Sequence, residues 1–177
     1  MDQTDVKVVN TDINRNGHSN IQYMSKVGDR FYHVHQIKHS PKIINKNDKD
    51  EAYDHLLKDW DKDVMDWVKE YKTLVLNRSN KPIFMITFEA LGKVTNDNIS
   101  KLFDIIKSLP NAYKIIIGQN SPERSVLPDE EDKNVAAQFK EFGRRNNIEV
   151  VQQLIMSPNS LYAFNQHELS NKNTVHK

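Results

Sequence analysis

The chain has 177 residues, a length that fits a single domain of ordinary size. Hydrophobic residues make up 37% and charged residues 28%, which supplies a core and excludes a wholly disordered chain. The 25 lysines and arginines nearly balance the 24 aspartates and glutamates, so no strong overall charge attracts nucleic acid. With 0 cysteines, disulfides, thiolate zinc sites and cysteine nucleophiles are excluded.

Residues 1–30 are predicted to be a loosely attached extension of the domain. Asparagine recurs through this range and apolar residues are few, so ordering it would bury little surface. The first twenty residues contain no apolar core of the kind that marks a signal peptide or a membrane anchor. We therefore expect a cytoplasmic protein that does not bind a membrane.

The next segments predict a strand followed by helical structure. Residues 31–38 alternate along FYHVHQIK, which predicts a strand near a sheet edge. Residues 48–70 carry apolar side chains at helical spacing, and Asp61 offers a second cap, which predicts two helices or one broken helix. Trp60 and Trp67, seven residues apart, are expected on one helical face in the core. An exposed tryptophan would instead indicate a binding surface for a partner.

Alternating strands and helices fill the rest of the chain. Helical periodicity predicts a helix over residues 98–109, capped by Asp97, and another over 129–147 that opens with four acidic residues. Between them, residues 113–117 predict a central strand and residues 118–128 a loop. Short apolar runs bounded by turn residues predict further strands at 73–76, 83–88, 148–156 and 161–164. This order indicates an α/β fold of mixed α+β type, with helices flanking a mixed sheet.

Residues 119–132, with the sequence QNSPERSVLPDEED, resemble a segment of the RadC-like branch of the JAB/MPN metallopeptidase fold. After an apolar strand, that family has His-Asn-His-Pro, a loop containing glycine and proline, and Ser-x-x-Asp at a helix start. Here Asn120, Pro122, Pro128 and Asp132 stand in register with this pattern without a gap. The resemblance extends over residues 41–169, through DEAYDHLLKDW at 50–60, LVLNRSNK at 74–81 and LIMSPNSLYAF at 154–164.

The resemblance implies a cytidine-deaminase-like JAB/MPN fold for a RadC-like domain over residues 31–169, followed by a tail over 170–177. In that family one zinc ion is held by two histidines and an aspartate, while a glutamate takes the proton of the bound water and a serine stabilises the oxyanion. When the family's site residues are placed on this sequence by that resemblance, most of the positions hold a different residue type.

In this chain the two histidine positions hold Gln119 and Ser121, the serine position holds Asp129, and the glutamate position falls at Thr87. Asp132 is the one family residue retained. An amide and a hydroxyl are poor zinc ligands beside imidazole, so we expect no bound zinc, no other cofactor and no catalytic residue. Asp132 is expected to serve as a capping or first-turn acid of its helix.

The first functional hypothesis is a catalytically inactive RadC-like domain, a pseudo-enzyme that acts as a protein-interaction or scaffold module. Its partner would be another protein, with a second copy of the chain in a homodimer as one candidate. A second hypothesis is a metal-dependent peptidase or isopeptidase with relocated ligands, for which His33 and His35 on one strand are the alternative metal ligands. A third, implied by the family's name together with a bacterial origin, is a DNA-repair-associated nucleic-acid-binding protein; the basic helix end at Arg144 and Arg145 would face phosphate.

Overall fold

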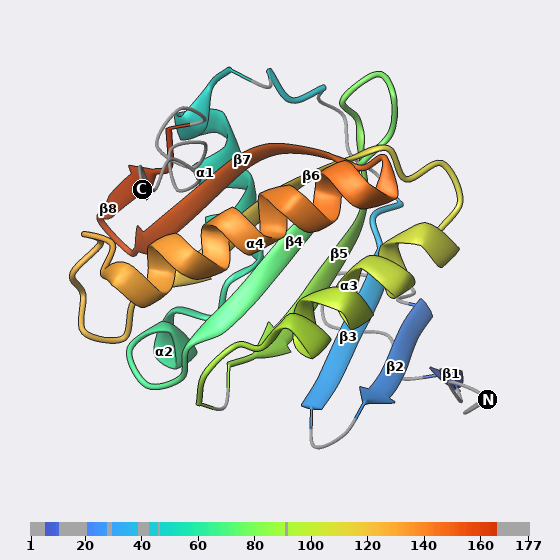
Figure 1. Cartoon of the computed structure of the whole chain (residues 1–177), viewed down its shortest axis with the longest axis horizontal. Helices are drawn as coiled ribbons and strands as arrows, with labels where there is room; N and C mark the ends of the chain where they lie inside the picture. The colour runs from blue at the N-terminus through green and yellow to red at the C-terminus, as the bar shows by residue number, and fades with distance from the viewer. Residues whose placement is uncertain are drawn as a thin grey trace, which may run out of the picture.

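The computed structural model describes residues 6–10, 21–27, 30–38, 43–45, 47–90 and 92–165. These residues form a mixed α/β fold in which helices cover both faces of a sheet (Figure 1). The helices are α1 (Lys49–Asp59), α2 (Lys62–Met65), α3 (Asn96–Ser108) and α4 (Glu130–Asn146). The strands are β1 (Val6–Asn10), β2 (Ile21–Val27), β3 (Arg30–Gln36), β4 (Glu70–Leu76), β5 (Pro82–Glu89), β6 (Lys114–Asn120), β7 (Glu149–Ser157) and β8 (Ser160–Ala163).

The described strands form one sheet in the order β1-β2-β3-β5-β4-β6-β7-β8. β6 and β7 run parallel, and the other neighbouring pairs among the described strands are antiparallel, so the sheet is mixed as predicted. A parallel pair needs a crossover connection, and α4 provides it between β6 and β7. α3 and α4 lie on one face of the sheet and α1 lies on the other (Figure 1).

Each face of the sheet carries its own hydrophobic core. Side-chain alternation along β6 sends Ile115 and Ile117 into the core beneath α3 and α4, and sends Ile116 into the core beneath α1. This strand is therefore buried on both faces, as its three consecutive isoleucines predict. The two faces are called here the α4 face and the α1 face.

Helix boundaries follow the capping residues of the sequence. Asp48 caps α1 and Asp61 caps α2, so the predicted break within residues 48–70 is confirmed. The cap of α3 is Thr95, in a capping box with Asn98, and not Asp97 as predicted. Asp97 lies inside the first turn, where its charge still suits the positive end of the helix dipole.

Trp60 and Trp67 do not form the predicted core pair. Trp60 is 4% exposed and lies in the core of the α1 face, whereas Trp67 is 84% exposed. The seven-residue spacing would place the two side chains on one face only if a single helix spanned both, but α1 ends before Trp60 and α2 ends at Met65. Trp67 follows α2 in a non-helical connection, which turns its side chain outward.

The strand predicted near a sheet edge, β3, lies inside the sheet, so that prediction is wrong. β3 pairs with β5 on one side and with β2 on the other. β2 and β1 come from the range 1–30, which was expected to be a loose extension, and they add two strands beyond β3 (Figure 1). Strand pairing satisfies the hydrogen bonds of the main chain whatever the side chains are. A polar segment can therefore form a strand at a sheet edge although its low hydrophobicity does not predict one.

The predicted domain boundaries at residues 31 and 169 stay predictions, and the expected tail over 170–177 lies outside the described residues. Within the part of the chain that is described, the helices are too short or too polar to cross a membrane.

Candidate functional site

The resemblance to metallopeptidases points to the end of β6, where Gln119 and Asn120 lie. These residues were predicted to belong to a loop that starts at 118, but they continue the strand. Gln119 is paired with Tyr71 of β4 and with Ile155 of β7, so neighbours on both sides extend the strand past its isoleucines. Because side chains alternate along a strand, Gln119 and Asn120 project to opposite faces of the sheet.

Three groups converge on the Asp132 carboxylate at the start of α4. Gln119 donates from Nε2 to Asp132 Oδ1 at 2.7 Å, and Lys69 donates from Nζ to the same oxygen at 3.0 Å. The Asp129 backbone N–H donates to Oδ2 at 3.2 Å. Asp132 is 8% exposed and Gln119 is 6% exposed, so these bonds lie mostly beneath the surface.

The electrostatics of this cluster favour an ionised Asp132. Burial by itself would raise the pKa of the carboxyl, but the hydrogen bonds from Gln119, Lys69 and the Asp129 N–H outweigh burial and lower the pKa of Asp132. The Lys69 ammonium supplies the balancing positive charge from the last residue before β4. Gln119, Lys69 and Asp132 are called here the Asp132 cluster.

Asp129 and Asp132 together form the N-terminal cap of α4. The Asp129 side chain accepts from the Asp132 backbone N–H at 2.7 Å, and the Asp132 side chain returns the bond to the Asp129 N–H. Acidic residues are favoured here because the first backbone N–H groups of a helix have no helical partner and carry positive partial charge. The family's serine and aspartate positions are thus both occupied by capping acids.

Asn120 forms hydrogen bonds with the main chain on the α1 face. Its side chain is fully buried, and its Nδ2 donates to the carbonyl oxygens of Met65 at 2.8 Å and Val68 at 2.7 Å. Its Oδ1 accepts from the Glu70 backbone N–H at 2.6 Å. One amide therefore fastens the connection between α2 and β4 to the end of β6.

Thr87 does not join the Asp132 cluster, because its side chain lies on the α1 face. Thr87 Oγ1 accepts from Lys72 Nζ at 3.1 Å, and Lys72 is paired with Asp59 of α1 at 3.0 Å. The sheet therefore separates Thr87 from Gln119 and Asp132. Of the positions that the resemblance assigned, the structure brings together Gln119, Asp129 and Asp132.

His33 and His35, the alternative metal ligands, also differ in their surroundings. His33 is exposed, while His35 Nε2 lies 3.4 Å from Asp59 Oδ1, an acid that the sequence alone did not place beside it. Burial by itself would raise the pKa of Asp59, but contacts with His35 and Lys72 lower it. Across the described ranges, no group of three or more His, Cys, Asp or Glu side chains is arranged to hold a metal ion.

The side chains at the Asp132 cluster do not suit the zinc ion that the family resemblance implies. Gln119 points an N–H donor, rather than a lone pair, at the carboxylate that would share the metal with it. The Lys69 ammonium already lies at 3.0 Å from that carboxylate, and a cation there repels a second one. Ser121 would add only a neutral hydroxyl, which is a poor ligand for zinc.

Lys69 is the site residue that sequence reasoning missed. It lies 63 positions before Asp132, and no spacing rule connects the two. The contact arises because β4 is antiparallel to β6, with Tyr71 opposite Gln119, and Lys69 precedes Tyr71 by two positions on the same face. A register prediction for the β4 and β6 pair would have been the signal that could find it.

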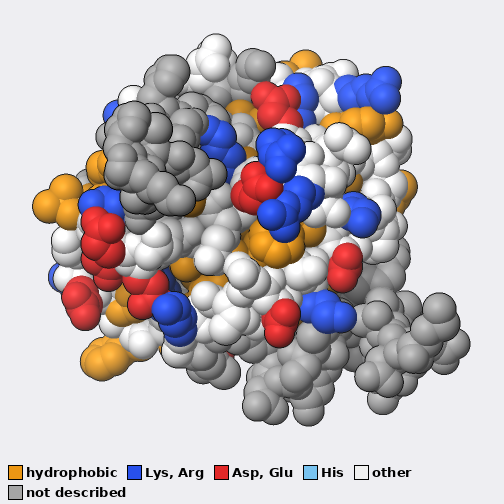
Figure 2. Space-filling model, in the orientation of Figure 1, with side chains coloured by type: hydrophobic (Ala, Val, Ile, Leu, Met, Phe, Trp, Pro, Cys, Tyr) orange, Lys and Arg blue, Asp and Glu red, His pale blue; other side chains and the backbone are white. Residues whose placement is uncertain are grey.

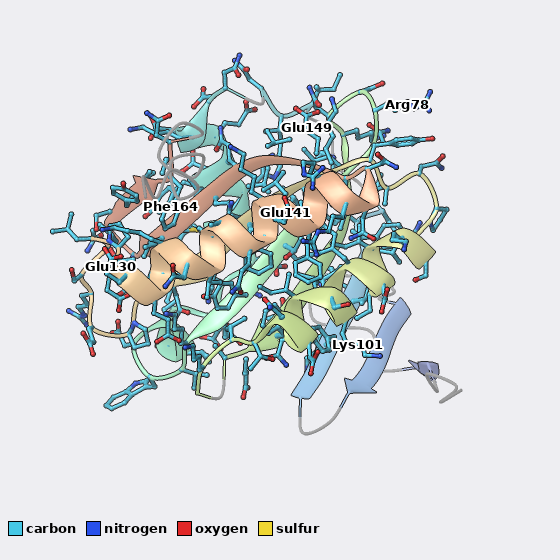
Figure 3. All side chains as sticks on the ribbon, viewed as in Figure 1. Arg78, Lys101, Glu130, Glu141, Glu149 and Phe164 are labelled. Atoms are coloured by element: carbon cyan, nitrogen blue, oxygen red, sulfur yellow. The ribbon has the colours of Figure 1, made fainter. Side chains whose placement is uncertain are left out.

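One acid of the same helix pairs with both arginines at the basic end of α4. Arg144 and Arg145 both contact the Glu141 carboxylate, at 2.8 Å in each case. Hydrogen bonds from Arg144 and then from Arg145 lower the pKa of Glu141 to about 2. Figure 3 shows Glu141 on the outer surface of α4, well away from Glu130 at the helix start. One carboxylate balances one of the two arginine charges, so the pairs reduce the positive charge that this end presents to phosphate.

A family model described as RadC-like JAB domain matches residues 47–169 of this chain. The chain belongs to the RadC-like JAB domain family. The match covers the Asp132 cluster, and it confirms the resemblance seen around Asn120, Pro122 and Pro128.

A curated relative, a UPF0758 protein of Clostridium tetani (strain Massachusetts / E88), is 27% identical over 118 residues, which cover 66% of this RadC-like chain and 49% of the relative. The chain therefore spans about half the length of the curated relative that it matches.

Proposed function

We propose that this RadC-like JAB domain has lost metal-dependent hydrolysis and acts as a protein-interaction module. The observation that carries the proposal is the Asp132 cluster. The family's retained carboxylate is already satisfied by an ammonium group, a side-chain amide and a backbone N–H. A site completed in this way has no need of a cation, so Asp132 serves the fold rather than a reaction.

The other two hypotheses receive less support from the geometry. A hydrolase with relocated ligands would need a new ligand set, but in the described part of the chain no three such side chains lie together, and His35 is paired with the single acid Asp59. Nucleic-acid binding through the end of α4 would compete with the Glu141 pairs for both arginines. A protein-interaction module, by contrast, requires neither a metal ion nor an additional ligand residue.

Zinc titration of the full chain tests the loss of the metal site. We expect the wild type to take up well under one equivalent of zinc in competition with a chromophoric chelator. The double variant Gln119→His, Ser121→His restores the family's ligands but keeps the Lys69 ammonium against Asp132. Adding Lys69→Ala should therefore raise zinc affinity at least ten-fold over the double variant, because it removes a competing positive charge.

The control is the same triple variant with Asp132→Ala, which should lose the gained zinc affinity. Circular dichroism of each variant checks that the fold is kept. One equivalent of zinc on the wild type that disappears with Asp132→Ala would overturn the proposal. Equal zinc affinity with and without Lys69→Ala would show that Lys69 does not take the place of the metal.

A further inference from the structure

Two large apolar side chains are exposed on the connections that lead to Lys69 and to Asp132. Trp67, between α2 and β4, is 84% exposed, and Leu127, between β6 and α4, is 75% exposed. Most tryptophan and leucine side chains in folded proteins bury the larger part of their surface. Tryptophan is also among the residues that contribute most to protein interfaces.

The two connections that carry these side chains are joined. Asp66, next to Trp67, accepts from Arg124 in a forked pair, with 2.6 Å between Oδ2 and Nη2 and 3.3 Å between Oδ1 and Nε. Figure 1 shows α2 and the connection from β6 to α4 at the same end of the sheet. We name residues 61–69 and 121–133 the Trp67 surface.

The backbone that presents Trp67 is held on both sides. Asn120 donates to the carbonyl oxygens of Met65 and Val68, which flank Trp67 in the chain. The Trp67 N–H itself donates to the Val64 carbonyl oxygen at 3.0 Å. A fixed backbone lowers the entropy that a binding side chain loses on association, so the outward position of Trp67 is preorganised for contact.

The Trp67 surface is acidic in a chain whose net charge is +1. Its two segments contain eight acidic and four basic residues, and with the buried Asp132 and its partner Lys69 set aside the surplus is still four acids. Three of those four cations are already engaged by acids of the same surface, in the pairs Lys69–Asp132, Arg124–Asp66 and Lys133–Glu130. Figure 2 shows acidic side chains gathered with protruding hydrophobic ones at the end of the molecule where α4 begins.

We propose that the Trp67 surface binds a basic segment of a partner protein, one in which apolar side chains are interspersed among lysines or arginines. The apolar side chains of the segment would cover Trp67 and Leu127, and its cations would meet the surplus of carboxylates. Nucleic acid does not fit, because its phosphates would face these acids. The inference rests on the proposed function as an interaction module, and it names the surface and the chemistry of the partner.

Binding of labelled peptides to the full chain, followed by fluorescence anisotropy, tests the proposal. The probe is a dodecapeptide of alternating lysine and leucine, and the comparison peptides replace either lysine by glutamate or leucine by serine. We expect the lysine–leucine peptide to bind at least ten-fold more tightly than either comparison peptide. Added salt should weaken that binding, because the Debye length falls from about 10 Å at 0.1 M to about 3 Å at 1 M.

Matched variants locate the binding on the molecule. Trp67→Ala and Leu127→Ala should each weaken the lysine–leucine peptide several-fold, while Ile43→Ala, at a side chain 60% exposed elsewhere, should leave it unchanged. Glu131→Lys should weaken it more than Asp104→Lys, since both acids are exposed but only Glu131 belongs to the Trp67 surface. The peptide should also protect tryptophan emission from acrylamide, because Trp60 is buried and Trp67 supplies the accessible ring.

Two results would overturn this inference. One is binding that survives Trp67→Ala and Leu127→Ala. The other is self-association in sedimentation that Trp67→Ala abolishes while the peptides do not bind, which would assign the surface to a second copy of the chain. Neither result bears on the zinc titrations, and zinc bound through Asp132 would overturn the proposed function while leaving the peptide measurements intact.

Discussion

The substitution Asp132→Asn separates a structural carboxylate from a catalytic one. It removes the charge that faces Lys69 at 3.0 Å and converts one carboxylate oxygen into an NH2 group. If the remaining oxygen keeps the Gln119 and Lys69 bonds at Oδ1, the new NH2 group faces the Asp129 N–H and the capping bond is lost. Two donors then point at each other at the start of α4.

The expected loss in the free energy of unfolding is about 1–2 kcal/mol. The capping bond accounts for about 0.5–1 kcal/mol. The weakened pair with Lys69, whose side chain is 36% exposed, adds an amount typical of a partly solvated ion pair, about 0.5–1 kcal/mol.

Urea unfolding followed by circular dichroism at neutral pH measures this loss. The matched control is Asp97→Asn, a first-turn acid of α3 that is exposed and is not the cap of its helix. We expect the control to change stability by less than about 0.5 kcal/mol. An Asp132→Asn chain as stable as the wild type would refute the structural role of the carboxylate.

The stability difference between the wild type and Asp132→Asn should change with pH in one direction. The pKa of Asp132 is lowered in the folded chain from the ordinary value of 3.8. Its ionised form therefore stabilises the fold fully above that value, and the contribution is lost as the pH falls through the lowered folded-state pKa. The stability gap between wild type and Asp132→Asn should shrink on acidification, and a gap that widens would contradict the assignment.

Two further substitutions test other parts of the fold. Asn120→Ala should cost about 3 kcal/mol in unfolding free energy, because it removes the partner of three backbone groups whose bonds to Asn120 are buried or partly buried. The exposed Asn96→Ala is the control, and equal losses for the two would be inconsistent with the bonding of Asn120. Gly143→Ala should destabilise the chain by about 2 kcal/mol, since a Cβ there would lie 2.7 Å from the Ile148 carbonyl oxygen and 2.6 Å from Val150 Cγ2. Helix propensity alone predicts the opposite sign for Gly143→Ala, by about 1 kcal/mol, so a gain in melting temperature would show that the backbone yields.

Local patterns in the sequence determined most of the secondary structure. The isoleucines of β6 predict a strand buried on both faces. The cap Asp61 predicts where α2 begins, and the run of four acids that opens at Asp129 predicts the start of α4. Local spacing also made the family recognisable, because Asn120, Pro122 and Asp132 lie close together in the chain and keep the family's spacing. Patterns of this kind can be read from a sequence because they depend on residues that are close together in the chain.

The tertiary structure alone decided which distant groups meet. Antiparallel pairing of β4 with β6 sets Lys69 against Asp132, whereas strand alternation sends Thr87 to the opposite face from Gln119. The break after α1 turns Trp67 outward although its spacing from Trp60 suits a buried helical face. These outcomes depend on strand register and on where a helix stops, and a shift of one residue in either moves a side chain to another face of the molecule.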